Sequence, residues 1–182
     1  MDDDFSDTRV WKTSKSTAGN VVYGEGNLSL AVAGAKGSLS SVSPYDLPQD
    51  FYLEMNATVS LCQYGDQYGL LFWYVDSGDT YRLTLTCDGR LRLELLAGSS
   101  GVVLQDWTYA SKLMPGAPAR HQIGLWVKDG EIQVFVNDTF QFKVKTRADR
   151  SGRLGVYAKA VGETAMTVGF SQLRVYQLNP AP

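Results

Sequence analysis

Residues 81–95 read Tyr81-Arg-Leu-Thr-Leu-Thr-Cys-Asp-Gly-Arg-Leu-Arg-Leu-Glu-Leu95, and this stretch decides the fold. Every second residue is apolar on both sides of the Asp88-Gly-Arg90 segment, and the residues between are charged or hydroxylated. A period of two is typical of a strand with one buried face. The Gly of the middle segment suits the left-handed position of a three-residue hairpin loop. The stretch therefore predicts two antiparallel strands that share an apolar face.

The same alternation recurs along most of the chain, whereas no segment keeps the 3.6-residue period of a helix. It is found at Phe51–Leu61, Ile123/Leu125/Val127, Ile132/Val134/Val136, Phe140/Phe142/Val144, Leu154/Val156/Ala158 and Met166/Val168/Phe170. Asp129-Gly130 and Asn137-Asp-Thr139 separate neighbouring segments as tight hairpin turns. Prolines 44, 48, 115 and 118 lie outside these segments, which agrees with the lack of an N–H for a sheet ladder. Strands with one apolar face each must pair through those faces, so we predict a two-sheet antiparallel sandwich.

Length and charge limit the number of domains and the classes of partner that the chain can have. The 182 residues suit one all-β domain, which we place at residues 1–178, with 179–182 as the start of a linker or tail. The net charge of −2 gives no excess of positive charge that would indicate nucleic-acid binding. No apolar run approaches the roughly 20 residues of a membrane span, so we expect no membrane insertion. The acidic start and the Pro-containing end suggest a module cut from a longer chain, and we expect a monomer.

Several segments resemble the concanavalin A-like lectin/glucanase superfamily, and nearly the whole chain takes part. Asp4-Phe-Ser-Asp7, Tyr68-Gly-Leu-Leu-Phe72, His121-Gln-Ile-Gly-Leu125, Gly152-Arg-Leu-Gly-Val156 and Phe170-Ser-Gln-Leu-Arg-Val175 carry the resemblance, in that order. The nearest relatives resemble laminin-G-like modules and the bacterial domains described as 3-keto-disaccharide hydrolase-like or family-16-glycosidase-like. The resemblance implies a jelly-roll sandwich and an extracellular, cell-surface or periplasmic location.

Two arguments disagree on whether the two cysteines form a disulfide. Strand alternation places Cys87 on an apolar face and Cys62 out of phase with the segment before it, so a bulge would be needed to join them. Bacterial surface modules of this kind pair a cysteine just before the Tyr-Gly-Leu-Leu segment with one in the Thr-Cys-Asp-Gly turn. The resemblance therefore implies a Cys62–Cys87 disulfide.

The departures from these families argue against inherited catalysis. The chain lacks the Glu-x-Asp-x-x-Glu pattern with which family-16 glucanases place nucleophile and acid on one strand. Where the hydrolase-like relatives carry Arg and Glu, the matching positions here are Trp73 and Arg82. We therefore lean away from an enzyme.

A candidate binding surface lies on the polar side of the central strands. If Asp76-Ser-Gly-Asp79 sets the pairing, Trp73 lies across from Arg82 and Leu71 across from Thr84. The next hairpin then places Thr84 beside Glu94 and Thr86 beside Arg92. An aromatic plane beside Arg and carboxylate groups suits a sugar, because C–H groups stack on the ring and charged groups bond the hydroxyls. The alternative is an ordinary cation–π pair with solvated charges around it.

Further residues are candidates for the binding surface, for a catalytic site or for a metal site. Tyr52 and Glu54, on the polar side of strand 51–61, would enlarge the same surface, and a hydrolase would need Glu94 and Glu54 in one cleft. Asp4 and Asp7 are weak candidates for a structural calcium ion against the simpler reading of an acidic, frayed terminus. His121 is expected to be a packed structural residue. Trp126, Gln133, Phe135 and Lys143 share a different face, which would suit a partner domain.

Taken together, the sequence favours a non-catalytic extracytoplasmic module of a larger surface protein. It would bind carbohydrate, or another protein or domain, on its polar, concave sheet face. A glycoside-processing hydrolase and a structural or protein-interaction spacer are the alternatives.

Overall fold

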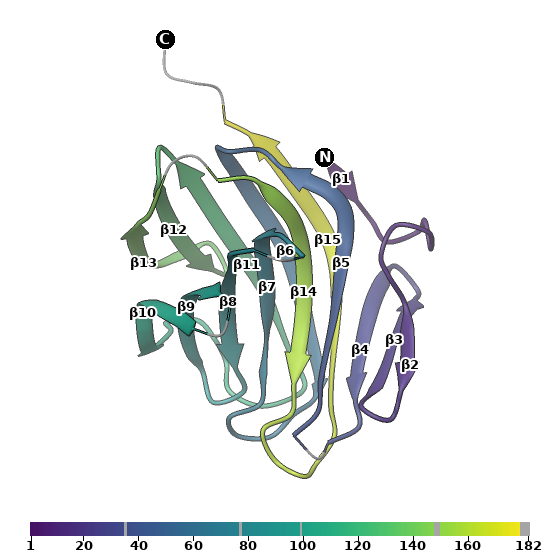
Figure 1. Ribbon diagram of the computed structural model, residues 1–182. Helices are drawn as coiled ribbons and strands as arrows, with labels where there is room; N and C mark the ends of the chain where they lie inside the picture. Colours follow the sequence, from purple (N-terminus) through teal and green to yellow (C-terminus); the bar gives the residue numbers. More distant parts are fainter. Residues whose placement is uncertain (35, 77, 99, 148–149, 179–182) are drawn as a thin grey trace.

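The computed structural model describes residues 1–34, 36–76, 78–98, 100–147 and 150–178. Within these ranges the regular structure is entirely antiparallel β, arranged as two sheets that face each other (Figure 1). In the same ranges, no helix is long and apolar enough to cross a membrane. The expected linker at 179–182 lies outside the described residues. The all-β sandwich predicted by the alternation is confirmed.

The larger sheet has nine strands. Its order is β13 (Thr139–Lys145), β12 (Glu131–Val136), β11 (Ala119–Lys128), β6 (Phe51–Leu61), β15 (Met166–Gln177), β4 (Asn27–Val32), β3 (Gly19–Gly24) and β2 (Ser14–Ser16), while β1 (Asp2–Asp3) pairs with β15. Strands far apart in sequence are therefore neighbours, as β6 is with both β11 and β15.

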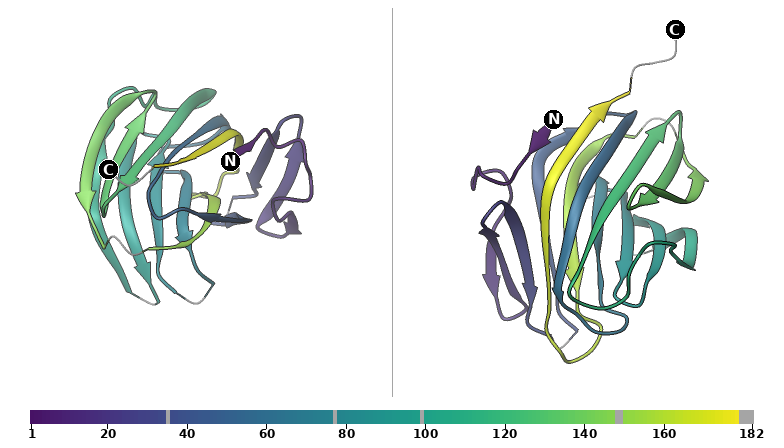
Figure 2. Two further views of the ribbon diagram at one scale, coloured as in Figure 1. Left: turned by 90° about the horizontal axis from the view of Figure 1, so that it is seen from above. Right: turned by 180° about the vertical axis from the view of Figure 1, so that it is seen from behind.

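The smaller sheet has six strands. Its order is β10 (Ser100–Tyr109), β9 (Arg90–Ala97), β8 (Thr80–Thr86), β7 (Gln67–Tyr74), β14 (Gly152–Lys159) and β5 (Ser38–Leu47). Seen from behind in Figure 2, the nine-stranded sheet lies in front of this one. The β8–β9 hairpin is the segment whose alternation predicts the fold.

The core lies between the sheets and is built from the alternate apolar side chains. Leu53 and Met55 of β6 and Leu83 and Leu85 of β8 are all fully buried, and so is Val156 of β14. The residues between them face outward on both sides. Since the sheets meet through apolar faces, each keeps one polar surface for water or a ligand.

The tight turns have the predicted backbone. Asp129 and Gly130 have φ of 49° and 74°, and Asn137 and Asp138 have φ of 48° and 59°. Positive φ at both central residues is the type I′ geometry that matches the twist of a hairpin. Gly89, with φ of 87°, occupies the left-handed position expected in the β8–β9 loop.

One proline lies in a strand that the alternation did not identify. Pro44 is inside β5, the strand at the edge of the six-stranded sheet. The ladder between β5 and β14 is irregular here, with Val42 opposite Gly155 and Asp46 opposite Arg153. A proline is tolerated on an edge strand, where its missing N–H need not serve a second neighbour.

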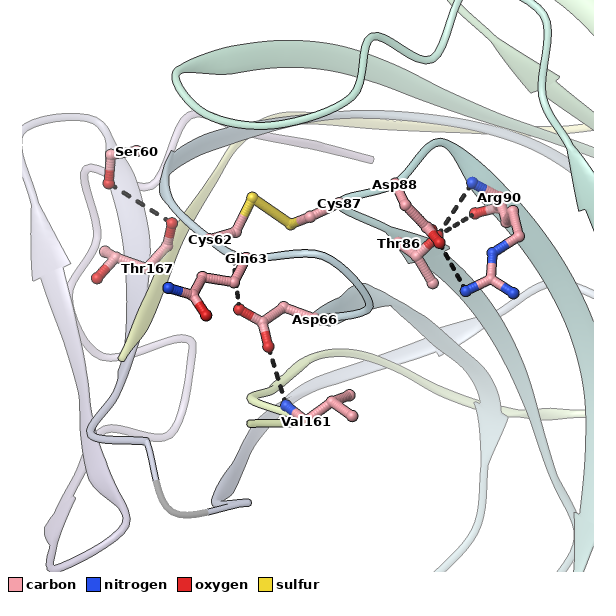
Figure 3. Close-up of a disulfide and its surroundings, with 10 residues drawn as sticks. All are labelled: Ser60, Cys62, Gln63, Asp66, Thr86, Cys87, Asp88, Arg90, Val161 and Thr167. Carbon is pink, nitrogen blue, oxygen red and sulfur yellow. Dashed lines mark hydrogen bonds and ion pairs between the residues drawn. A yellow bond between two sulfur atoms is a disulfide. The ribbon is translucent and has the colours of Figure 1, made fainter. Parts of the chain in front are cut away.

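The structure joins Cys62 and Cys87 in a disulfide with Cα atoms 6.3 Å apart (Figure 3). Cys62 directly follows β6 of the larger sheet, and Cys87 directly follows β8 of the smaller one. The bridge therefore ties the two sheets together. Alternation argues against it only if β6 continues through Cys62. Because β6 ends at Leu61, no bulge is needed.

A buried carboxylate fixes the chain next to this bridge. Asp66 accepts hydrogen bonds from the backbone N–H groups of Gln63, at 2.8 Å, and Val161, at 2.9 Å (Figure 3). Its own carbonyl oxygen accepts from the N–H of Cys87 at 3.0 Å. The crossing from one sheet to the other is thus held by a covalent bond and by backbone hydrogen bonds.

His121 is a packed core residue, as predicted, and it makes stability depend on pH. It is 1% exposed, opposite Ala57, and its Nδ1 has no hydrogen-bond partner among the described residues. Burial lowers its pKa below the ordinary value of 6.5. Above pH about 6.5 both folded and unfolded chains hold it neutral. Below that pH the unfolded chain takes up the proton first, so stability falls by up to about 1.4 kcal/mol per pH unit until the lowered pKa is reached.

Urea unfolding at pH 7.5 and pH 5.5 measures this loss. His121 is the only histidine of the chain, so a His121→Leu variant should show a flatter profile over the same interval. Equal slopes for the two proteins would contradict the assignment.

Candidate functional site

The outward side of the six-stranded sheet carries a mixed polar and apolar surface, here called the polar face. It consists of alternate residues of five neighbouring strands, namely Arg92, Glu94 and Leu96 of β9, Arg82 and Thr84 of β8, Gly69 and Leu71 of β7, Tyr157 and Lys159 of β14, and Ser38 and Ser40 of β5. Arg82, Thr84, Arg92 and Glu94 are brought together here, on the side where alternation places them.

The neighbours on this face differ from the expected ones. Arg82 lies opposite Leu71 on one side and Glu94 on the other. Thr84 lies opposite Gly69 and Arg92. Both hairpins are thus displaced by two residues from the expected register. The first differs because β7 ends at Tyr74 and β8 begins at Thr80, a longer connection than the Asp76–Asp79 turn. A shift of two keeps each side chain on its face and changes only its partners.

Trp73 does not belong to the polar face, and its expected stacking role is wrong. It has φ of 49° and is 2% exposed. The positive φ interrupts the alternation, so Phe72 and Trp73 are both buried. The Trp73 ring lies 5.2 Å from Tyr81 and 5.9 Å from Phe51, centroid to centroid. It contributes to the core and offers no surface to a ligand.

Two arginines share one carboxylate at the centre of the face. Arg82 Nη2 lies 2.7 Å from Glu94 Oε2, and its Nε donates to the same oxygen at 3.2 Å. Arg92 Nη2 lies 3.1 Å from Glu94 Oε1. The Glu94 side chain is 12% exposed, against 30% for Arg82. Both carboxylate oxygens are therefore occupied, while the guanidinium groups keep edges toward solvent.

Two aromatic residues that the sequence reasoning missed are Tyr157 on the polar face and Trp107 beside it on β10. The Arg82 guanidinium carbon lies 5.7 Å from the Tyr157 ring centroid, and the Tyr157 hydroxyl bonds Thr84 Oγ1 across Gly69. Burial raises the pKa of Tyr157, which keeps it a neutral phenol. Trp107 of β10 lies under Arg90 and Arg92, with guanidinium carbons 5.2 and 5.4 Å from its ring.

Sequence signals for these two rings differ. Tyr157 alternates with Val156 and Ala158 in the predicted strand, so phase alone would place it outward. Trp107 has no such signal, because β10 pairs with β9 through two irregularities, one on each side of Gln105.

A hollow of about 290 Å³ opens on the polar face. It is lined by Ser38, Leu39, Ser40, Leu71, Arg82, Leu96, Tyr157 and Lys159. Gly155 lies beside it, where an added Cβ would come within 3.3 Å of the Leu71 side chain and 3.2 Å of Val42. The hollow thus combines leucine walls with hydroxyl, phenol and cationic groups.

Tyr52 and Glu54 lie on the opposite surface of the molecule, which corrects the expectation that they extend the face. They belong to β6 of the nine-stranded sheet and point away from the core there. The Tyr52 hydroxyl donates to Glu54 Oε1 at 2.8 Å. The repetitive alternation tells which side of a strand is polar but not which sheet the strand joins. Glu54 and Glu94 therefore cannot flank one glycosidic bond.

Trp126, Phe135 and Phe140 are part-exposed aromatic residues of the nine-stranded sheet. Trp126 lies opposite Gln133, which in turn lies opposite Lys143. The rings of Phe135 and Phe140 are 5.8 Å apart. Trp126, Gln133, Phe135 and Lys143 share one face, as alternation predicts. Phe140 was expected on the apolar face with Phe142, but it is 49% exposed, because an irregularity of the β12–β13 ladder changes its phase.

The acidic N-terminal residues bind their own neighbours. Asp4 Oδ1 accepts from the backbone N–H of Ser6 at 2.9 Å. Asp7 binds Arg9 through both carboxylate oxygens, and these bonds lower the pKa of Asp7 to about 2. Among the residues that the structure describes, no three His, Cys, Asp or Glu side chains converge as metal ligands would. Calcium binding at Asp4 and Asp7 stays a prediction.

Comparison with known proteins identifies the fold. No protein-family model and no curated protein sequence matches the chain. Among solved structures, a protein of unknown function with a galectin-like fold from Bacillus subtilis is 12% identical, with a TM-score of 0.73 over 97% of this chain and 94% of that one. The β-glucanase of Bacillus licheniformis is 11% identical, with a TM-score of 0.71 over 98% of both chains.

The carbohydrate-binding module CBM66 from Bacillus subtilis is also similar, at 12% identity and a TM-score of 0.65 over 92% of this chain and 95% of that one. At such identities the likeness concerns the fold and not the activity. Two antiparallel sheets packed as a jelly-roll sandwich are common to these structures and this protein. The chain therefore has the concanavalin A-like lectin/glucanase fold.

Proposed function

We propose that this protein is a carbohydrate-binding module that holds its ligand on the polar face without cleaving it. The observation that carries the proposal is the Arg82–Glu94–Arg92 network beside a hollow walled by Leu71 and Leu96. A sugar presents hydroxyl groups at its rim and C–H groups on its flat faces. Charged side chains bond the hydroxyls strongly, and leucine side chains shield the C–H face from water.

The structural neighbours support the class of ligand by analogy. One is described as a carbohydrate-binding module and another as a β-glucanase. A fold hosts many functions, so the site has to carry the argument. Here it does so through the polar face, which differs from the surface expected around Trp73.

The carboxylates of the polar face favour binding over hydrolysis. A glycosidase needs two carboxyl groups facing one cleft, about 5–5.5 Å apart for retention or about 6.5–9.5 Å for inversion. Both oxygens of Glu94 are held by arginines, and Asp88 is held by Arg90 at 2.6 Å. Neither is free to meet a glycosidic oxygen. We therefore expect no release of reducing sugar from a polysaccharide panel, and release that disappears in Glu94→Gln would overturn this part.

The disulfide supports a site of action outside the cytoplasm. Bridges such as Cys62–Cys87 form and persist in oxidising compartments. On this ground we propose that the module acts outside the cytoplasm.

Binding is tested by an Arg82→Gln substitution. The variant keeps Arg92 beside Glu94 but loses the guanidinium that lines the hollow. Affinity for any glycan that binds the wild-type protein is expected to fall at least about tenfold, the worth of one charge-assisted hydrogen bond. Affinity electrophoresis over a panel of soluble polysaccharides, followed by titration calorimetry on the positive ones, measures it.

Arg174→Gln is the matched control. Arg174 is an exposed strand arginine of the nine-stranded sheet, opposite Glu54. It should leave binding unchanged. Absence of binding across the panel, or an equal loss in both variants, would contradict the proposed site.

A further inference from the structure

The charges at the hollow are unbalanced. Its lining includes two cations, Arg82 and Lys159, and no carboxylate. Lys159 is exposed and forms no ion pair or hydrogen bond within the described part of the chain. Arg82 does have a partner, but it shares Glu94 with Arg92. These three cations therefore face two carboxylates, Glu94 and, 4.0 Å from Arg92, Asp106, which leaves one positive charge in excess.

The arginine network also has more donors than acceptors. Arg92 Nε is buried and lacks a hydrogen-bond partner among the described residues, since the Asp106 carboxylate stays 4.0 Å away. The Nε of Arg90 is in the same condition. Buried donors normally find acceptors, and one left unpaired calls for an explanation. Arg90 and Arg92 are not among the residues that line the hollow. A ligand in the hollow that brings negative charge would offset the excess positive charge of the face.

Both cations, Arg82 and Lys159, line the same hollow. Lys159 follows Tyr157 on the outward side of β14, and Arg82 extends from β8 over the Tyr157 ring. Ser38 and Ser40 lie opposite Lys159 and Tyr157 on β5. At about 290 Å³ the hollow is at the small end of ligand sites, which suits a single sugar residue.

We propose that the sugar residue seated in this hollow is anionic, with a carboxylate or a sulfate group held between Arg82 and Lys159. This inference rests on the proposed carbohydrate-binding function and names its ligand class. A guanidinium binds such planar or multidentate oxyanions through paired N–H groups, and an ammonium adds a mobile point charge. Leu71 and Leu96 then cover the apolar side of the sugar ring.

Matched pairs of polysaccharides test the charge directly. Polygalacturonate is compared with its methyl ester, and dextran sulfate with dextran, by titration calorimetry at about 0.15 M salt, where long-range attraction is largely screened. At least one charged member is expected to bind about tenfold more tightly than its neutral counterpart. Binding of polygalacturonate alone identifies a carboxylate ligand, and binding of dextran sulfate alone identifies a sulfate ligand.

A lysine pair separates a built site from general attraction to polyanions. Lys159→Gln should weaken binding of the charged member about fivefold and leave the neutral member unaffected. Lys15→Gln, at an exposed lysine of β2 on the other sheet, should change nothing. Equal losses in the two variants would show unspecific attraction and overturn the inference.

The outcomes also separate this inference from the proposed function. If neutral glycans bind as tightly as charged ones and Arg82→Gln still abolishes binding, the binding function stands and the anionic ligand is wrong. If none of the glycans binds, both fail.

Discussion

Replacing Trp73 by alanine is expected to lower the free energy of unfolding by about 3–5 kcal/mol, the range for removing a buried Trp or Phe side chain. The indole is 2% exposed and packs edge-on against Phe51 of one sheet and Tyr81 of the other. Its loss leaves a cavity between the sheets that rigid backbones cannot fill. Urea denaturation followed by tryptophan fluorescence and circular dichroism measures the change.

Trp126→Ala provides the control. Trp126 is half-buried on the outward side of β11, so its removal opens no internal cavity and is expected to cost about 1 kcal/mol or less. Similar losses for the two variants would mean that Trp73 is not the interior residue the structure shows. At temperatures where Trp73→Ala is still folded, it should bind ligand like the wild-type protein, because its ring does not reach the polar face.

Removal of the disulfide by Cys62→Ser and Cys87→Ser together is expected to cost about 3–4 kcal/mol. The bridge closes a loop with a sequence separation of 25, and the chain-entropy relation gives that amount for a loop of this length. For a domain of this size the melting temperature should fall by about 10 °C. Differential scanning calorimetry of the double variant measures it.

Reductant supplies an independent check. Dithiothreitol should lower the melting temperature of the wild-type protein toward that of the double serine variant and leave the variant itself unchanged. A wild-type melting temperature that stays constant in the reduced, thiol-counted protein would contradict a stabilising bridge.

Alternation along the strands predicts the sheets well, for a physical reason. Each strand has one face against the core, so its side chains must alternate, and turns such as Asp129-Gly130 fix where strands end. Alternation does not predict how many residues of a connection stay outside the strand pairing. The connection between Tyr74 and Thr80 is longer than expected, so the pairing of the two strands is displaced by two residues. Arg82 therefore lies opposite Leu71 and not opposite Trp73. On its other side it lies opposite Glu94.

The candidate site could be predicted only in part from local sequence patterns. Glu54 and Glu94 have the same phase in their strands, yet they belong to different sheets, because strand order depends on contacts far apart in sequence. Trp73 leaves its phase through a single positive φ that no neighbouring residue signals. Alternation predicts the outward position of Tyr157. It does not predict that of Trp107, because Trp107 lies on an irregular strand.

Pro44 has a consequence for access to the ligand. The strand that carries it also carries Ser38 and Ser40 of the hollow, and this strand is the open margin of its sheet. An exposed strand margin invites a second molecule to dock by backbone hydrogen bonding. Proline offers no N–H there, and the bulged ladder opposite it spoils the spacing that an incoming strand would need. Even in concentrated solution, neighbouring molecules should therefore leave the entrance to the hollow clear for a glycan.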